Sequence, residues 1–368
     1  MVYLDRGRVF YSVLRDSPVH VERQGVASDH LGSCFDVLHS VHYFSCCEIQ
    51  DEKSESQGNS VKALQSAQKS SVLDLKAIVL LTVLCASWGL QQVTIKIANQ
   101  GVSPILQSGI RSVGAAILVW IWMTACREPL FKKDGTLWWG IGIGFLFSGE
   151  FILIYWGLVF TNASRAVIFL YMSPFVVALG SQFFIPGEHL RKIQIMGLCC
   201  AFTGIVIAFW ESLSFPTYKM LIGDCMLAIA AVLWGAVTVM IKASPLAGIG
   251  HSKTLLYQLG VSALVLPAAS IVMNERGIVL MTPLIALCLA YQAVWVAFIT
   301  YLVWFWLIRH YPVSRIASFT FLTPIFGVLA GGLLLNEPVS KSLLLALLLV
   351  GTGIYLVNRP DVNHASEQ

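Results

Sequence analysis

Ten long apolar stretches, separated by short polar connectors, occupy the chain from residue 75 onward. A helix needs about 20 mostly apolar residues to cross the hydrocarbon core of a bilayer. Gly, Pro, Asn or charged residues mark most of the connectors, as at 99–101 and 274–276. The pattern therefore predicts an all-α membrane protein with ten transmembrane helices, at 75–98, 103–126, 137–160, 163–184, 191–210, 220–243, 252–273, 283–309, 313–335 and 340–358.

Two segments of the first half return in the second half. The segment 87–98, SWGLQQVTIKIA, reappears at 233–244 as LWGAVTVMIKAS, and 163–188 reappears at 313–337 with Ser-Arg, Pro and Glu in the same order. The offsets of 146 to 150 residues are nearly constant, which indicates a duplicated unit. Five helices per unit is an odd number, so the second unit must cross the membrane upside down. Two inverted five-helix repeats are typical of a transporter core.

The repeats and the charge distribution together predict the domain organisation. Residues 1–70 hold 16 of the 44 charged residues and contain no long apolar run. This segment is predicted to be a disordered cytoplasmic head. An alternative is a misassigned start codon, with translation beginning near Val61 or Leu64. The predicted order is a head at 1–70, a first repeat at 71–214, a second repeat at 215–360 and a tail at 361–368.

Composition excludes several classes of function. The chain is 57% hydrophobic and 12% charged, against about 25% charged residues in soluble domains. Its net charge of +4 includes no basic cluster interleaved with aromatic residues, so no nucleic acid partner is expected. The nine cysteines form no spaced ligand set with histidine, so no metal is expected. The absence of a Walker loop and of a His-Glu-x-x-His motif argues against ATP drive and metalloprotease chemistry. A membrane-embedded enzyme would need a clustered nucleophile, a carboxylate pair or a metal set, so we expect no cofactor, no catalytic residues and no enzyme activity.

Positive charge in the short loops predicts the orientation. With a cytoplasmic N-terminus, twelve Lys and Arg residues lie on the inner side and five on the outer side. The prediction is a multi-pass protein of the cytoplasmic (inner) membrane with both termini in the cytoplasm. The expected partners are the lipid bilayer and a small-molecule substrate, whereas the oligomeric state is not determined by the sequence.

The repeated motifs, taken in order, resemble the EamA family of the drug/metabolite transporter superfamily. They are the Trp-Gly of each first span, YMSPFVVAL and FLTPIFGVL in each fourth span, the following Gly187-Glu188 and NEPVS, and GLCCAFTGIVI and LLLVGTGIYLV in each fifth span. The resemblance covers about residues 75–358. It implies ten helices, a central substrate cavity, and export or uptake of small metabolites. Members of the family carry amino acids, nucleosides, cofactors and drugs, so the resemblance does not specify a substrate.

Two charged residues, Arg111 and Glu150, fall well inside predicted spans, away from their ends. Arg111 in the second span and Glu150 in the third both lie about 12–15 Å below the outer surface, at a rise of about 1.5 Å per residue, and are placed to pair. Charges in hydrocarbon usually face a cavity or a partner. Glu150 is therefore a candidate substrate anchor or proton-coupling carboxylate. The alternative is a buried salt bridge that only fixes packing. The second repeat has no acidic residue near 298–300.

Other side chains are candidates for the cavity or for its movement. Aromatic and polar residues within the spans are expected to contact the substrate, namely Gln92, Tyr171, Trp234, Gln258, Tyr301 and Trp304. Pro174 and Pro324 free a backbone carbonyl and allow a kink, so they are candidate hinges. Arg165 and Arg315 recur at the start of each fourth span and are candidate gate residues. Lys96 and Lys242 end equivalent spans and are expected to reach the interface.

The sequence thus predicts a secondary transporter of small organic metabolites, such as amino-acid-like solutes, that works by alternating access with proton coupling as an option. The alternatives are a non-transporting membrane scaffold or sensor, and an exporter of drugs or cofactors. Inverted repeats favour transport, because a scaffold has no need of access from two sides.

The predicted orientation can be tested with topology reporters. We expect a reporter fused after Arg359 to read cytoplasmic and one inserted near Asn274 to read external, because the positive-inside rule assigns these ends to opposite sides. Alkaline phosphatase and fluorescent-protein fusions measured in the same cells check both sites. The reverse pattern would contradict the assigned orientation.

Overall fold

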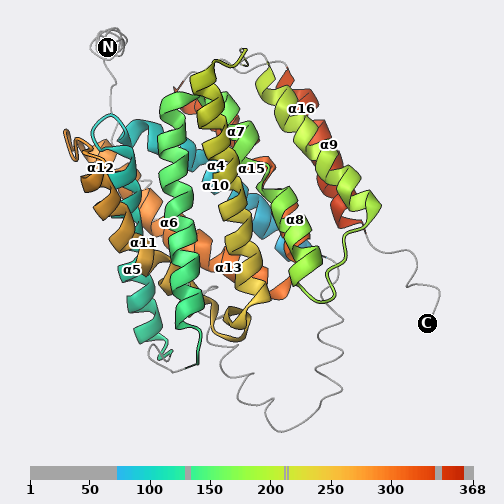
Figure 1. Ribbon diagram of the computed structural model, residues 1–368, viewed down its shortest axis with the longest axis horizontal. Helices are drawn as coiled ribbons and strands as arrows, with labels where there is room; N and C mark the ends of the chain where they lie inside the picture. Colours follow the sequence, from blue (N-terminus) through green and yellow to red (C-terminus); the bar gives the residue numbers. More distant parts are fainter. Residues whose placement is uncertain (1–72, 129–133, 211–212, 214, 336–341, 360–368) are drawn as a thin grey trace, which may run out of the picture. The chain divides into compact units, whose positions relative to one another are not determined.

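The computed structural model describes residues 73–128, 134–210, 213, 215–335 and 342–359. The predicted head and tail therefore lie outside the described residues. The described ranges are helical, and their extended backbone pairing is an isolated bridge between Val102 and Ile278 (Figure 1). The all-α prediction is confirmed for this part of the chain.

The helices follow the predicted spans closely. In the first half they are α4 (Leu75–Ala98), α5 (Pro104–Ala125), α6 (Leu137–Phe160), α7 (Ala163–Leu170), α8 (Ser173–Phe184) and α9 (Lys192–Phe209). In the second half they are α10 (Tyr218–Ala243), the short η3 (Pro245–Gly248), α11 (His251–Val272), α12 (Pro283–Ala290), η4 (Tyr291–Thr300), α13 (Tyr301–His310), α14 (Val313–Phe319), α15 (Leu322–Leu335) and α16 (Ser342–Asn358).

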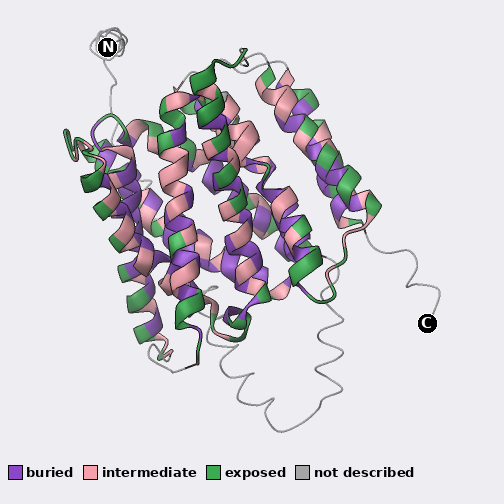
Figure 2. Cartoon of the chain, viewed as in Figure 1, coloured by how far each residue is buried: buried purple, intermediate pink, exposed green. Residues whose placement is uncertain are grey.

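Nine helical segments in the described ranges are long and apolar enough to cross a membrane. The segment predicted as the tenth span is the apolar helix α16, which has 17 described residues. Exposed positions run along the helices (Figure 2), and many of them are large apolar residues. Leu333, for example, is 82% exposed. Such faces are unfavourable in water and suit contact with lipid.

Three of the predicted continuous spans have interrupted α-helical winding. The fourth span breaks at Tyr171–Met172, between α7 and α8, and the ninth breaks at Thr320–Phe321, between α14 and α15. Each break lies just before a predicted hinge, Pro174 or Pro324. The eighth span changes to a π-helix, η4, between α12 and α13. A π-helix inserts extra residues per turn and re-aims the side chains that follow.

Helix contacts cross between the two halves of the chain. Helix α4 packs against α15, and α10 packs against α8. Helix α4 also contacts α12 and η4, while α10 contacts α6. Helices α5 and α11 contact each other, as do α9 and α16, which lie side by side in Figure 1. Each half therefore completes its packing with helices of the other half.

The repeated Trp-Gly motif has a packing explanation. A Cβ atom added to Gly89 would lie 2.6 Å from the Cβ atom of Phe326 and 2.7 Å from the backbone nitrogen of Gly327, where α4 meets α15. At the equivalent position a Cβ atom on Gly235 would lie 2.5 Å from Cγ1 of Val176, where α10 meets α8. Glycine lets these helices approach closely. The preceding tryptophan of each motif is thereby held beside the helix crossing.

Replacing this glycine should loosen the crossing. We expect Gly89→Ala to lower stability by about 1–3 kcal/mol, because the added methyl group meets backbone that must move aside. Gly351→Ala is the matched control, because no atom lies within 4 Å of the position a Cβ would take at Gly351. Thermal unfolding in detergent micelles measures both. Equal unfolding temperatures for the two variants would contradict the close packing.

Candidate functional site

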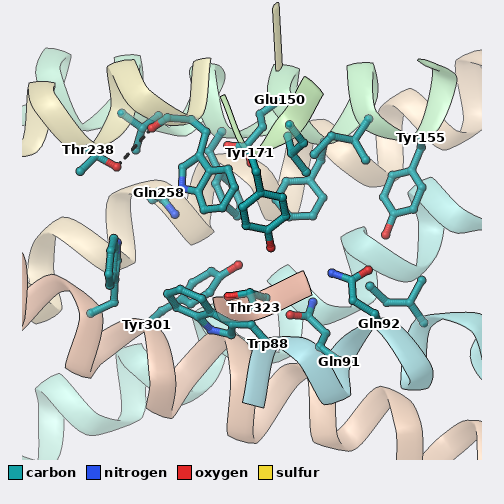
Figure 3. A pocket seen from close by; sticks show the side chains of 18 of the residues that line it. Trp88, Gln91, Gln92, Glu150, Tyr155, Tyr171, Thr238, Gln258, Tyr301 and Thr323 are labelled. Carbon is teal, nitrogen blue, oxygen red and sulfur yellow. Dashed lines mark hydrogen bonds between the residues drawn. The ribbon is translucent and has the colours of Figure 1, made fainter. Parts of the chain in front are cut away.

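A cavity of about 210 Å³ lies among helices of both halves, with walls from α4, α6, α7, α10, α11, α13 and α15. Figure 3 shows Trp88, Gln91 and Tyr301 on one side of the cavity, facing Glu150 and Tyr171 on the other. Both halves of the chain therefore contribute to one cavity within the part that the structure describes.

Aromatic side chains are the most numerous kind in the wall. The nine that line it are Trp88, Phe147, Phe151, Tyr155, Tyr171, Trp234, Tyr301, Trp304 and Phe305. Several of them hold one another edge to face: the ring centroids of Trp88 and Trp304 are 5.3 Å apart, and those of Tyr171 and Trp234 are 5.8 Å apart. Such contacts fix the ring orientations, so the wall presents defined aromatic faces and edges.

Polar groups interrupt this wall at a few points. Gln91, Gln92, Thr238, Gln258 and Thr323 contribute uncharged polar side chains. The Oε1 atom of Gln258 is buried and has no hydrogen-bond partner among the described residues. Buried polar atoms nearly always have a partner in a working structure. The amide of Gln258 is thus available to a bound molecule.

Glu150 is the acidic side chain of the lining. It is 6% exposed, and within the described ranges its carboxyl group has neither a hydrogen bond nor an ion pair. A buried carboxylate without such partners is costly to maintain. Its place on the wall of a cavity, rather than in a packed interface, gives it access to a solute or a proton.

The predicted direct pair between Arg111 and Glu150 is not present in the described structure. Arg111 is 1% exposed, its Nε and Nη2 atoms have no hydrogen-bond partner there, and its Cζ atom lies 4.4 Å from the ring centroid of Phe151. The helix positions had suggested comparable depth, but the Phe151 ring takes up the guanidinium group. Arg111 does not line the cavity, although its charge acts on Glu150 at longer range.

The two repeats differ at one equivalent pair of residues. The indole Nε1 of Trp88 donates a 2.9 Å hydrogen bond to Oγ1 of Thr300. Trp234 follows Trp88 by 146 residues, and Thr300 follows Glu150 by 150 residues. The counterparts of Trp88 and Thr300 are therefore Trp234 and Glu150, which both line the cavity. A carboxyl group stands where the other repeat has a hydroxyl group bonded to its tryptophan.

The π-helix explains how the eighth span reaches the Trp-Gly motif. Tyr291 donates a 3.0 Å hydrogen bond to the carbonyl of Ser87, and Nε1 of Trp295 donates one of 2.9 Å to the Ser87 hydroxyl. Thr300, which bonds Trp88, ends the same segment. The spacings of four and five residues put these three side chains on one face of the wider π winding. The face anchors Trp88 at the cavity wall.

The candidate gate residue Arg165 belongs to a charge cluster at one end of two cavity helices. Its Nε atom donates to the Asp224 carboxylate at 3.0 Å, and its Nη2 atom pairs with the same group. Thr161 adds a 2.8 Å hydrogen bond to Asp224. The cluster joins the start of α7 to α10. Arg315, its counterpart, is buried in α14.

A second cluster lies at the other end of α10 and joins it to the segment after α8 and to the start of α14. Nζ of Lys242, at the end of α10, pairs with Glu188 at 3.0 Å and donates to the carbonyl of Tyr311. Glu188 accepts the backbone N–H of Val313 at 3.1 Å, which caps the start of α14. Lys242 was expected to reach the interface; at this helix end it has an acidic partner in the connector after α8. Burial raises the pKa of Tyr311 to about 12, so its phenol stays protonated and donates to Asp74 at 2.9 Å.

Six of the eight predicted substrate or coupling residues are aromatic or amide side chains, and all six line the cavity: Gln92, Tyr171, Trp234, Gln258, Tyr301 and Trp304. Pro174 and Pro324 lie next to helix breaks rather than on the cavity wall.

Sequence reasoning did not identify Phe147, Phe151, Thr238 and Thr323 as part of the cavity lining. A signal existed for the first two, since Phe147, Glu150, Phe151, Ile154 and Tyr155 are spaced three to four residues apart on one helical face. The two threonines carried no such signal, because they lie among apolar neighbours on helices whose buried faces were not predicted.

Comparison with known sequences agrees with this architecture. The sequence model of the EamA-like transporter family matches residues 75–210 and 221–359. The chain belongs to the EamA-like transporter family. The resemblance predicted from the repeated motifs is therefore confirmed. Together with the apolar helices, family membership makes this a multi-pass membrane transporter, a class distinct from enzymes.

EamA relatives cover most of the chain. It is 24% identical over 279 residues to "Uncharacterized transporter YoaV" of Bacillus subtilis, spanning 73% of this chain and 92% of the relative. It is 25% identical over 300 residues to "Probable amino-acid metabolite efflux pump" of Escherichia coli, spanning 79% and 95%. A crystal structure titled "Crystal structure of protein" shares the fold, with a TM-score of 0.66 and 17% identity over 77% of this chain and 97% of that one.

The Trp88–Thr300 hydrogen bond should stabilise the cavity wall. We expect Thr300→Val to cost about 1–3 kcal/mol, because the buried indole N–H loses its acceptor. The Thr300 hydroxyl itself donates to the carbonyl of Val296, four residues earlier, at 2.6 Å. Thr352→Val is the control, because the Thr352 hydroxyl donates to the carbonyl four residues before it at 2.7 Å but is exposed. Thermal unfolding in detergent compares them. A loss for Thr300→Val no greater than for Thr352→Val would show that this bond is dispensable.

Proposed function

We propose that this EamA protein is a secondary transporter that moves small organic metabolites, with amino-acid-like solutes as the first class to test, across the cytoplasmic membrane by alternating access. The observation that carries the proposal is the cavity, which is walled by helices of both halves and contains the buried Glu150. A chamber of this kind, in the middle of apolar spans, suits a solute that leaves water on one side and regains it on the other.

The helix contacts support two inverted repeats. The counterpart of α4 in the second half is α10, and that of α8 is α15. If each helix is exchanged for its counterpart, the contact of α4 with α15 becomes that of α10 with α8. The contact of α4 with η4 likewise becomes that of α10 with α6, and the contact of α5 with η4 becomes that of α11 with α6. This exchange is what a pseudo-two-fold axis produces. We propose ten spans, with α16 as the tenth.

The two charge clusters support access from two sides. Arg165 and Asp224 join one end of α7 and α10, while Glu188 and Lys242 join α10 to the end of the fourth span at the other. In the predicted orientation, the first cluster faces outside and the second faces the cytoplasm, with both termini inside. Rocking that breaks one cluster while the other holds would open the cavity to one side at a time.

We propose that Glu150 couples transport to protons. The charged and titratable groups around it are Arg111 on α5, Tyr155 on its own helix and Tyr301 on α13. The tyrosines are neutral at physiological pH, so Glu150 is the group in this set whose protonation can change during a transport cycle. Export is the favoured direction, because the Escherichia coli relative is named as an efflux pump.

The experiment that tests the function is counterflow in proteoliposomes with a metabolite panel. We expect exchange of at least one amino-acid-like solute, and accumulation when a pH gradient is imposed. In Glu150→Gln the response to the gradient should be lost, because an amide cannot exchange a proton. Gradient-driven accumulation at the wild-type rate in this variant would contradict proton coupling.

A double-mutant cycle separates coupling from packing. If Glu150 only balances Arg111, then Glu150→Gln should lower stability and adding Arg111→Gln should partly restore it. If Glu150 couples protons, the second change should leave the gradient response lost. Absence of exchange for every solute in wild-type vesicles would instead favour a scaffold or sensor, and exchange of drugs or cofactors alone would favour an exporter of those compounds.

A further inference from the structure

The charge on the cavity wall has one sign. Among the described residues of the lining, Glu150 is the acidic side chain, and none is lysine, arginine or histidine. The nearby cation, Arg111, is separated from the cavity by the ring of Phe151. A solute that enters this chamber therefore meets a carboxyl group and no cationic side chain. A negatively charged solute would be desolvated without a partner of opposite charge.

The rest of the wall also suits a positively charged solute. Aromatic faces attract cations through the negative charge of their π systems. Trp234, Tyr171 and Tyr301 line the same cavity as Glu150. Figure 3 shows Tyr171 on the side of Glu150 and Tyr301 on the opposite side. At the position that corresponds to Thr300, the hydroxyl partner of Trp88, the first repeat has Glu150.

We propose that this cavity recognises the positively charged amine of its substrate, with the ammonium group at Glu150 and the hydrocarbon part against the aromatic wall. The proposal rests on the proposed transport function and names its substrate class. Amine and proton then compete for one carboxyl group. In each case one positive charge neutralises the Glu150 carboxylate. The net charge of the site near Arg111 is therefore the same whether the amine or the proton is bound.

Four probes that share a phenyl group isolate the effect of charge. They are phenethylammonium, the neutral 2-phenylethanol, the anion 3-phenylpropionate and the zwitterion phenylalanine. Binding to the purified full-length protein in detergent at constant pH is followed by calorimetry. We expect phenethylammonium to bind at least about tenfold more tightly than the alcohol or the anion, with the zwitterion between them. Equal or tighter binding of 3-phenylpropionate would overturn the proposal.

Variants then assign the effect to named groups. Glu150→Gln should weaken phenethylammonium about tenfold or more and leave 2-phenylethanol within about twofold. Glu150→Thr copies the residue that the second repeat has at this position, so it provides a second neutral variant if the amide destabilises the fold. Trp234→Leu should weaken the amine more than the alcohol, because it removes a π face but keeps the charge. Unchanged amine binding in both Glu150 variants would overturn the proposal.

Counterflow with the same probes distinguishes this inference from the proposed function. If phenethylammonium binds but no probe or metabolite exchanges, the amine site stands and the transport function is wrong. If neutral or anionic solutes exchange while phenethylammonium neither binds nor exchanges, transport stands and the amine site is wrong.

Discussion

The structure depends on one constraint: inside hydrocarbon, each backbone polar group must find its partner within its own helix, and each charge must find a partner nearby. Most described spans satisfy this with continuous α-helices, and the charges at the helix ends form the Arg165–Asp224 and Lys242–Glu188 clusters. Two of the three spans with interrupted α-helical winding meet in one place. Tyr171, at the first helix break, and Thr323, just past the second, both line the cavity that contains Glu150.

The Trp-Gly motif shows how the duplicated sequence builds this place. Gly89 and Gly235 let α4 and α10 meet the broken spans of the opposite halves, and the neighbouring tryptophans are set on the cavity wall. The halves then diverge in chemistry. Trp88 is tied to Thr300, whereas the equivalent pair Trp234 and Glu150 both face the chamber. A nearly symmetric arrangement of helices thus has an asymmetric cavity wall. Such a wall suits a solute with distinct polar and apolar ends.

The same asymmetry limits what family membership says about this chain. The family model shows a transporter of the EamA-like family, and the relatives at 24% and 25% identity are named as transporters or efflux pumps. They do not determine the side chains that contact a solute, because function depends on the site and not on the fold. In this chain the cavity wall has nine aromatic rings and the carboxyl group of Glu150, while the guanidinium of Arg111 lies over the Phe151 ring, and we propose that this arrangement selects the charge of the solute.

The sequence by itself determined the apolar spans, their order and the family, because lipid imposes length and composition on every spanning helix. It also pointed to Tyr171, Trp234, Gln258 and Tyr301, since polar or aromatic side chains deep in a span need a buried environment. Only the tertiary structure decided which groups meet. Phe151 separates Arg111 from the cavity, Glu188 binds Lys242, and the π winding brings Thr300 to Trp88. These outcomes depend on helix rotation and on the fit between neighbouring helices, which are properties of pairs of segments and leave no signal in the periodicity of either one.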